Sequence, residues 1–331
     1  MKQNVLLELV KYLFAAFLSV SLLYGVWLLA RMLLFDYFTI PSESMYPTLK
    51  PGDKVVVNKL LMGARIYTDL HFAPAGQELE SWRTKGMRPL RHNDIVVFNF
   101  PHHEWRISFV INNVFCKRVV ALPGDSLSIV DGHYRNNNFE GVLGLEEEQR
   151  RLENTPDSVL WQPLLPTIPH HERFGWTIRN FGPMYMPRKG DIMTVTPYEA
   201  TLYNIFLAWE TGKPVTCDWD TGEVWAGDAP LKRHCWQHNY YFMAGDNVLD
   251  SNDSRYWGLV PEEYVVGVVG YVYKNNTLSR CSKLFYYIKV SHSHICHTLS
   301  WPSLPSVYQS LCPHSSIKQK KNLPQYRVRQ I

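Results

Sequence analysis

The uncharged run Tyr12–Ala30, YLFAAFLSVSLLYGVWLLA, constrains this chain more than any other feature. Lys11 and Arg31 bound the run, and apolar residues continue to Phe35. At 1.5 Å per residue, about 20 such residues cross the hydrocarbon core of a bilayer. The run is longer than the apolar part of a signal peptide, and no small-x-small cleavage site follows it. We therefore expect a membrane-spanning helix over about 12–35, rather than a buried core helix.

The basic residues around this run do not decide its orientation, because only an excess of Lys and Arg on one side would do so. They lie before it at Lys2 and Lys11 and after it at Arg31, Lys50 and Lys54. No second segment in the sequence is as long and as free of charge. We expect one anchor within residues 1–37 and one large domain on a single side of the membrane.

Beyond the anchor, short runs rich in β-branched and aromatic residues are separated by Gly, Pro and Asp, which predicts strands. These runs are DKVVVNKLL (53–61), DIVVFNF (94–100), FVINNVFCKRVVAL (109–122), HNYYFMAGDN (238–247) and EYVVGVVGYVYK (263–274). Asp131-Gly132 between two extended segments predicts a two-residue hairpin. The aromatic content of 14% also fits a protein built mostly of strands. The expected fold class is therefore mostly β or α+β, behind one helix.

The middle of the chain, residues 137–237, has a different character and is expected to be a smaller α+β accessory insertion. LEEEQRRLENT (145–155) predicts a short polar helix. TPYEATLYNIFLAWETG (196–212) predicts an amphipathic helix, with Thr196 as its cap and Gly212 as its stop. The tail 275–331 is rich in Ser, His, Lys and Pro, and we expect it to be basic and poorly ordered.

Composition excludes several classes of function. The net charge of +4 over 331 residues is too small to indicate nucleic-acid binding. The six cysteines form no CxxC pair, which argues against a zinc ribbon or a thioredoxin-like site. Outside the cytoplasm, a Cys217–Cys235 disulfide is compatible with the pattern. HSHICH (292–297) contains metal-binding residue types, but no second ligand cluster supports it, so a polar tail is the preferred interpretation.

Two serines, Ser42 and Ser44, lie in the stretch PSESMYPTL (41–49) just after the anchor. Taken alone, they are typical of a turn. A serine hydroxyl becomes a good nucleophile only when a base takes its proton, and no histidine lies close in sequence. A lysine can be that base if burial lowers its pKa from the usual value of about 10.4.

Lys117, in FCKRVVALPGD (115–125), has the surroundings that such a base needs. On a strand it shares one face with Phe115 and Val119. The alternative is an edge-strand lysine that discourages aggregation. A third stretch, GDNVLDSNDSRYWGLVPEE (245–263), is dense in Asp, Asn and Ser, and alone it would indicate a polar loop that leads into a strand.

Together, in this order behind an N-terminal anchor, the three stretches resemble type I signal peptidases of bacteria. These are membrane-anchored serine–lysine endopeptidases that remove signal peptides from exported proteins. The resemblance covers about 12–274 apart from the insertion. It implies a catalytic antiparallel β core made by 38–136 and 238–274. It also implies a single-pass protein of the inner membrane, with the catalytic domain on the non-cytoplasmic side. The partners it implies are preproteins, the bilayer and the export machinery, with no nucleic acid, metal or organic cofactor.

By motif position, Ser44 resembles the family's nucleophile and Lys117 its general base. Ser42 then donates its hydroxyl to the oxyanion hole beside the backbone N–H of Ser44, and Ser251 orients the Lys117 amine. Taken alone, Ser251 would be a loop cap, so this role depends on the joint occurrence of the three stretches.

The resemblance also assigns residues around this centre. Asp253 and Arg255 form a supporting pair beneath it, although alone they would indicate a surface ion pair of little value. Ile40, Met45 and Tyr46 are candidates for the pockets that hold small substrate residues at the first and third positions before the cut.

One departure from the family pattern keeps two rival interpretations open. Bacterial members commonly read G-D-N-R-D, whereas here Val248 and Leu249 replace the last two residues. This change supports a membrane-anchored binding protein that has lost activity. A self-cleaving regulator with a serine–lysine pair is the second rival. The anchor, and the absence of a DNA-binding motif from the sequence, argue against that regulator.

Overall fold

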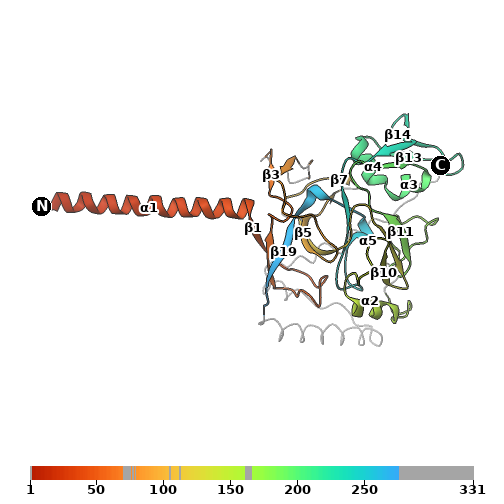
Figure 1. Ribbon diagram of the computed structural model, residues 1–331, viewed down its shortest axis with the longest axis horizontal. Helices are drawn as coiled ribbons and strands as arrows, with labels where there is room; N and C mark the ends of the chain where they lie inside the picture. The colour runs from red at the N-terminus through yellow and green to blue at the C-terminus, as the bar shows by residue number, and fades with distance from the viewer. Residues whose placement is uncertain are drawn as a thin grey trace, which may run out of the picture. The chain divides into compact units, whose positions relative to one another are not determined.

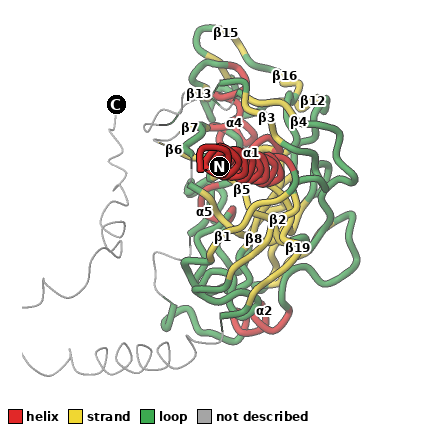
Figure 2. The backbone as a smooth tube through the Cα atoms, turned by 90° about the vertical axis from the view of Figure 1, so that its left-hand side faces the viewer, coloured by secondary structure: helices red, strands yellow, loops and turns green. Residues whose placement is uncertain are grey.

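One seven-stranded sheet forms the centre of the fold in a computed structural model, which describes residues 2–69, 76, 78, 80–103, 106–111, 113–160 and 166–275 (Figure 1). In spatial order its strands are β1 (Phe35–Thr39), β2 (Lys54–Asn58), β19 (Val265–Tyr273), β5 (Ile95–Asn99), β8 (Val114–Ala121), β17 (Tyr240–Ala244) and β18 (Val260–Pro261). Every neighbouring pair is antiparallel. Strand β19 lies between β2 and β5, so segments far apart in sequence share the sheet. Figure 2 shows strands of this sheet in a view along α1. The expected mostly antiparallel β fold is confirmed.

The helix before the sheet is α1 (Lys2–Leu33), and its part Glu8–Leu33 is long and apolar enough to cross a membrane. None of the apolar window in this part is buried against the described domain. The expected helix is therefore present. It begins before residue 12 because the preceding leucine, lysine and glutamate residues are good helix formers.

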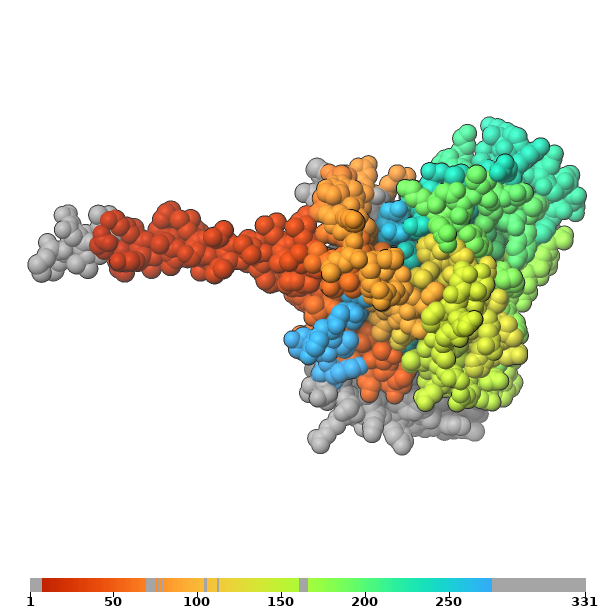
Figure 3. Space-filling model, in the orientation of Figure 1, coloured from red at the N-terminus to blue at the C-terminus, as the bar shows by residue number. Residues whose placement is uncertain are grey.

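Smaller elements from the middle of the chain pack beside the main sheet; Figure 3 shows them in yellow to cyan, on the side away from α1. The small sheets are β10 (His133–Asn136)–β9 (Ser126–Val130)–β11 (Phe181–Tyr185), β12 (Ile192–Thr194)–β16 (Arg233–Cys235) and β13 (Val215–Cys217)–β14 (Val224–Ala226)–β15 (Ala229–Pro230). The helices are α2 (Glu146–Glu153), α3 (Pro197–Leu202) and α4 (Asn204–Thr211). Asp131 and Gly132, both with positive φ, form the predicted turn between β9 and β10.

The remaining short elements lie along the chain between strands of the main sheet. They are β3 (Arg65–Tyr67) paired with β4 (Ser81–Arg83), β6 (His102–His103) paired with β7 (Arg106–Ile107), α5 (Ser254–Trp257) and the 3₁₀ helix η2 (Glu262–Tyr264).

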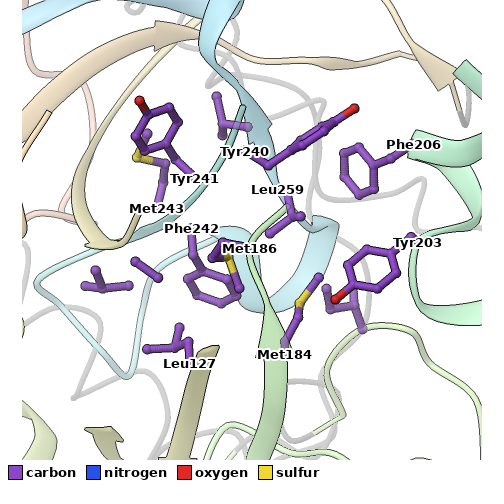
Figure 4. Close-up of a cluster of buried hydrophobic side chains, with 14 of the residues drawn as sticks. Leu127, Met184, Met186, Tyr203, Phe206, Tyr240, Tyr241, Phe242, Met243 and Leu259 are labelled. Atoms are coloured by element: carbon purple, nitrogen blue, oxygen red, sulfur yellow. The ribbon is translucent and has the colours of Figure 1, made fainter. Parts of the chain in front are cut away.

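Two clusters of buried apolar side chains cover the two faces of the main sheet's central strands. The larger cluster joins side chains of the main sheet to those of the middle part, such as Met184, Met186, Phe206, Tyr240 and Phe242 (Figure 4). The smaller cluster consists of Ile40, Met45, Leu49, Val55, Val57, Val97 and Val266. Because the middle part and the main sheet share one core, the division into a catalytic core and an accessory insertion stays a prediction.

Two local expectations differ from the structure. The segment 196–212 forms two helices because the backbone of Tyr203 leaves the helical conformation, with φ −107° and ψ 19°. Thr196 still caps the first helix, and Gly212 ends the second with φ 64°.

Cys217 and Cys235 are both free thiols, so the disulfide considered between them is not formed. Their strands, β13 and β16, belong to different small sheets. The HSHICH segment and the tail from residue 276 lie outside the described residues.

Candidate active site

The segment that carries Ser44 leaves the main sheet directly after β1 and is held on both sides. Ile40 donates its backbone N–H to the carbonyl oxygen of Asp53 at 2.8 Å, which continues the pairing of β1. Met45, on the other side of Ser44, is 1% exposed within the smaller cluster. These two buried residues fix the backbone between them, and Ser44 itself stays half-buried at a cleft.

Lys117 reaches the same place from strand β8. Its neighbours on the strand alternate as predicted: Phe115 and Val119 pack with the larger cluster, and Cys116 packs with the smaller one. Lys117 is 3% exposed. Its Nζ lies 2.5 Å from Ser44 Oγ, within hydrogen-bond distance. The fold thus brings together a hydroxyl and an amine that are 73 residues apart in sequence.

The surroundings of Lys117 disfavour its charged form. Burial is the largest effect and lowers the pKa of the ammonium below its usual 10.5, although the charge of Asp253 opposes this shift. Among the described residues, no carboxylate forms an ion pair with Lys117. A lysine in this state is a far better proton acceptor at neutral pH than an exposed one.

The cleft beside this pair has a volume of about 290 Å³. Its lining combines polar residues near Ser44 with apolar residues of β8 and of the segment after β1. The lining residues are Ile40, Pro41, Ser42, Glu43, Ser44, Val114, Phe115, Cys116, Lys117, Asp250 and Asn252. Ser42 Oγ lies 3.3 Å from Ser44 Oγ. Burial raises the pKa of the Cys116 thiol to about 12, so this thiol stays protonated and is a poor nucleophile.

A fully buried ion pair lies behind the cleft. Arg255 donates two hydrogen bonds to Asp253, from Nε to Oδ1 and from Nη2 to Oδ2, both at 2.8 Å. Gly245 donates its backbone N–H to the same carboxylate at 2.9 Å. Burial raises the pKa of Asp253, but Arg255 and these hydrogen bonds outweigh it and hold the pKa below its usual range. The alternative of an exposed pair is wrong, because both side chains are 0% exposed.

Comparison with known proteins matches a part of the chain that includes Ser44, Lys117 and Asp253. Residues 7–274 match the family described as "Signal peptidase, peptidase S26". The chain belongs to this peptidase family. Similar proteins named "Signal peptidase I" occur in several bacteria. That of Buchnera aphidicola subsp. Baizongia pistaciae is 26% identical over 78% of this chain and 75% of its own length. That of Pseudomonas aeruginosa is 27% identical over 72% of this chain and 65% of its own length. That of Haemophilus influenzae is 26% identical over 75% of this chain and 66% of its own length.

This signal peptidase does not form every contact that the resemblance implies. Ser251 is 6% exposed, and among the described residues its Oγ has no hydrogen-bond partner. The expected hydrogen bond from Ser251 to the Lys117 amine is therefore not formed here. Instead, Ser251 Oγ packs against Gly245, where a Cβ atom would collide with it and with the Ser44 carbonyl oxygen. Only glycine fits at this position.

Of the three residues expected to line substrate pockets, only Ile40 contributes to the cleft. The side chain of Met45 turns inward because the smaller cluster buries it. Tyr46 is 41% exposed and lies beneath the Lys50 ammonium, outside the cleft lining. The cleft instead uses Val114, Phe115 and Cys116, which sequence reasoning missed although they directly precede Lys117.

Sequence reasoning also missed the contacts that hold the Ser44 segment against the third motif. Asn247 donates its backbone N–H to Ser44 O at 3.1 Å and its side-chain amide to Glu43 O at 3.2 Å. Asp246 accepts a hydrogen bond from the hydroxyl of Thr48, in the Ser44 segment, and two from Arg118 of β8, both at 2.6 Å. The only indication of these contacts in the sequence was that Asp246 and Asn247 directly follow the motif glycine Gly245.

The two residues that depart from the family pattern pack into an apolar environment. Val248 is 3% exposed and lies in a cluster with Leu152 and Ile178, which Leu249 borders. The backbone carbonyl of Val248 still accepts a hydrogen bond from Arg255 at 3.0 Å. Apolar side chains therefore fill this part of the loop, and the ion pair behind the cleft is retained.

Proposed function

We propose that this signal peptidase cleaves preproteins with Ser44 as nucleophile and Lys117 as general base. The single observation that supports this most is the 2.5 Å distance between Ser44 Oγ and the Nζ of a buried lysine. A nucleophile within hydrogen-bond distance of its base is the geometry that covalent catalysis requires. The pKa of Lys117, lowered by burial, provides the neutral amine.

In the proposed reaction, neutral Lys117 accepts the hydroxyl proton as Ser44 Oγ attacks the scissile carbonyl carbon. The tetrahedral intermediate collapses to an acyl-enzyme, and Lys117 gives its proton to the departing amine. Lys117 then takes a proton from water as the water oxygen attacks the ester carbonyl carbon. When the bond from this carbon to Ser44 Oγ breaks, Lys117 returns the proton to Ser44 Oγ and the acid product leaves. Because Asp253 and Arg255 neutralise each other behind the cleft, neither competes for the proton in transit.

The oxyanion of the intermediate is proposed to bind the Ser42 hydroxyl and the backbone N–H of Ser44. Ser42 Oγ, 3.3 Å from the nucleophilic oxygen, is close enough for this role. Removing one such donor costs roughly 2.7–4 kcal/mol of transition-state stabilisation in serine peptidases. Ser251 is proposed to orient the Lys117 amine only once substrate occupies the cleft.

The proposed substrates are exported preproteins with small residues at the first and third positions before the cut, often Ala-x-Ala. The apolar part of the cleft, with Ile40, Val114 and Phe115, supports this preference. The anchored protein is proposed to reside in the inner membrane with its catalytic domain outside the cytoplasm, where exported preproteins emerge. Contact with the export machinery belongs to the same proposal. Cleavage that is unaffected when the two small residues are made bulky would contradict the stated preference.

The test is cleavage of a preprotein with an Ala-x-Ala signal peptide, in detergent, by wild type and by Ser44→Ala. We expect cleavage at the predicted bond by wild type and a loss of more than about 10³-fold in the variant. Ser158→Ala is the matched control, because Ser158 is an exposed serine outside the cleft.

Each other outcome has a definite meaning. If neither folded wild type nor Ser44→Ala cleaves, the non-catalytic rival replaces the proposal. Equal cleavage by both assigns the activity to a different serine or to a contaminating protease. Loss of cleavage in Ser158→Ala as well would indicate a fault in folding, which a thermal unfolding scan would detect.

A further inference from the structure

A half-buried lysine joins the end of the membrane helix to the main sheet. Lys59 Nζ donates hydrogen bonds to the carbonyl oxygens of Arg31 and Met32, at 2.8 and 3.4 Å. Its backbone N–H donates to Leu34 O at 2.9 Å. These carbonyls belong to the last turn of α1 and the residue after it, where a cation also interacts favourably with the helix dipole.

Asp36 completes the junction from strand β1. Its carboxylate accepts from Lys59 at 3.2 Å and from Arg31 at 2.6 Å. The Arg31 guanidinium lies over the rings of Trp27 and Tyr37, 5.2 and 4.7 Å from their centroids. We call Arg31, Asp36 and Lys59 the junction cluster. The side chains of Lys59 and Asp36 are only 13% and 20% exposed, so water screens this pair less than a surface pair.

The chain between the junction cluster and the nucleophile has little freedom. All five residues of β1, Phe35–Thr39, pair with β2. Ile40 continues this pairing, and Met45 is buried just beyond Ser44. Ser44 follows Leu34 within ten residues, so the distance between them is at most about 33 Å. The membrane helix is thus coupled to Ser44 through a paired strand without a flexible linker.

We propose that the junction cluster holds Ser44 at a set height above the bilayer and so selects the number of residues between a signal peptide's apolar stretch and its cut. This inference rests on the proposed function. A signal peptide in the same bilayer presents its scissile bond at a height that changes by about 3.3 Å per extended residue. Misplacement of reacting groups by about 1 Å can cost a hundredfold in rate, so a fixed nucleophile accepts a narrow range of spacings.

The test uses full-length enzyme in lipid vesicles with a series of preproteins that differ only in this spacing. For wild type we expect one preferred spacing and at least about a fivefold loss of cleavage three residues away from it. Asp36→Asn removes the shared carboxylate at constant size, and Lys59→Met removes the ammonium. In each variant we expect cleavage rates that differ by less than about twofold across the same series of spacings. The reason is that α1 and β1 can then move relative to each other.

Two controls separate the inference from the proposed function. A soluble peptide that spans the cut but lacks the apolar stretch should be cleaved equally by wild type and both variants. Asp157→Asn removes the carboxylate of another arginine ion pair, Arg179–Asp157, and should keep the wild-type spacing profile. If wild type fails to cut the soluble peptide, the proposed function is wrong.

If all enzymes cut the soluble peptide and the variants keep the wild-type spacing profile, the inference about the junction cluster is overturned. Thermal unfolding identifies a variant that does not fold. The other variant then decides the question, since each breaks the junction cluster from a different side. A variant that shifts the preferred spacing without broadening it would also contradict the loosening that we propose.

Discussion

Two lysines near the main sheet, Lys59 at the anchor junction and Lys117 in the cleft, have opposite surroundings. Burial is the largest effect on both and lowers the pKa of each ammonium. Lys59 has three oxygen acceptors, one of them in the carboxylate of Asp36. Among the residues that the structure describes, Lys117 has one hydrogen-bond partner, the hydroxyl of Ser44.

The difference shows what makes a buried lysine structural or reactive. A carboxylate partner stabilises the ammonium and holds the side chain in place, as Asp36 does for Lys59. Without such a partner, as at Lys117, burial favours the neutral amine, which can accept a proton. Behind the cleft, the carboxylate of Asp253 instead forms an ion pair with Arg255. Whether a carboxylate pairs with the ammonium therefore decides whether a lysine has a structural or a reactive role.

The largest expected difference between the two sites is in catalysis. Lys117→Arg should lower kcat/KM for a soluble peptide by about 10³–10⁴-fold, because a guanidinium does not give up its proton near neutral pH. Lys59→Arg should change this value by less than about twofold, since its charge is retained. Steady-state kinetics on the soluble peptide measure both. Similar losses in the two variants would mean that the comparison is wrong.

The second-largest expected difference is in the free energy of unfolding when the carboxylate near each lysine is removed. Asp253→Asn leaves Arg255 buried without a counter-charge and should cost about 3–5 kcal/mol of unfolding free energy. Asp36→Asn should cost no more than about 1 kcal/mol, because its ion pairs are partly exposed. Urea unfolding of both variants and wild type tests this order. A larger loss for Asp36→Asn would show that the junction contributes more to stability than the pair behind the cleft.

The pH profile should distinguish the lysines as well. Below the pKa of Lys117, kcat/KM should rise about tenfold per pH unit as the amine loses its proton, and it should level off below pH 10.5. Lys59→Met should leave this rising limb in place. Measurement on the soluble peptide between pH 5 and 10.5 covers the limb. A flat profile over this range would argue against a lysine base.

The smallest effect should be a gain in stability when the unpaired lysine is removed. The folded-state pKa of Lys117 lies below its unfolded value of 10.5, so the folded protein binds fewer protons and wild-type stability rises with pH across this window. Lys117→Met should therefore unfold at a higher temperature than wild type at neutral pH. The gain should shrink toward pH 10.5. Each kcal/mol corresponds to roughly 2–4 °C in a domain of this size. The pKa of Lys59 is lowered as well. Lys59→Met, however, also removes the ion pair with Asp36 and the hydrogen bonds to the carbonyl oxygens of Arg31 and Met32, so it should show no net gain.

Features that depend on short-range pattern could be predicted well from sequence. The anchor follows from an apolar run that no soluble surface accommodates, and the main strands follow from alternation with a period of two. That alternation also placed Phe115, Lys117 and Val119 on one face of β8. The three motifs pointed to Ser44 and Lys117 only through resemblance, because nothing local in either stretch requires the other.

Tertiary packing decided what local pattern leaves open. Burial in the smaller cluster turned Met45 away from the cleft. Ser251 Oγ packs against Gly245 and has no hydrogen-bond partner among the described residues. Packing against Leu152 and Ile178 gave Val248 a buried position that its place in a polar loop does not indicate.

The sequence by itself determined the membrane helix, the strands and the residue types available for chemistry, because each depends on neighbours within a few positions. Only the tertiary structure decided which charges meet. It placed Lys117 beside Ser44 across 73 positions and Lys59 beside Asp36 across 23. Whether a buried lysine is paired depends on such long-range contacts, and this pairing distinguishes the junction from the cleft.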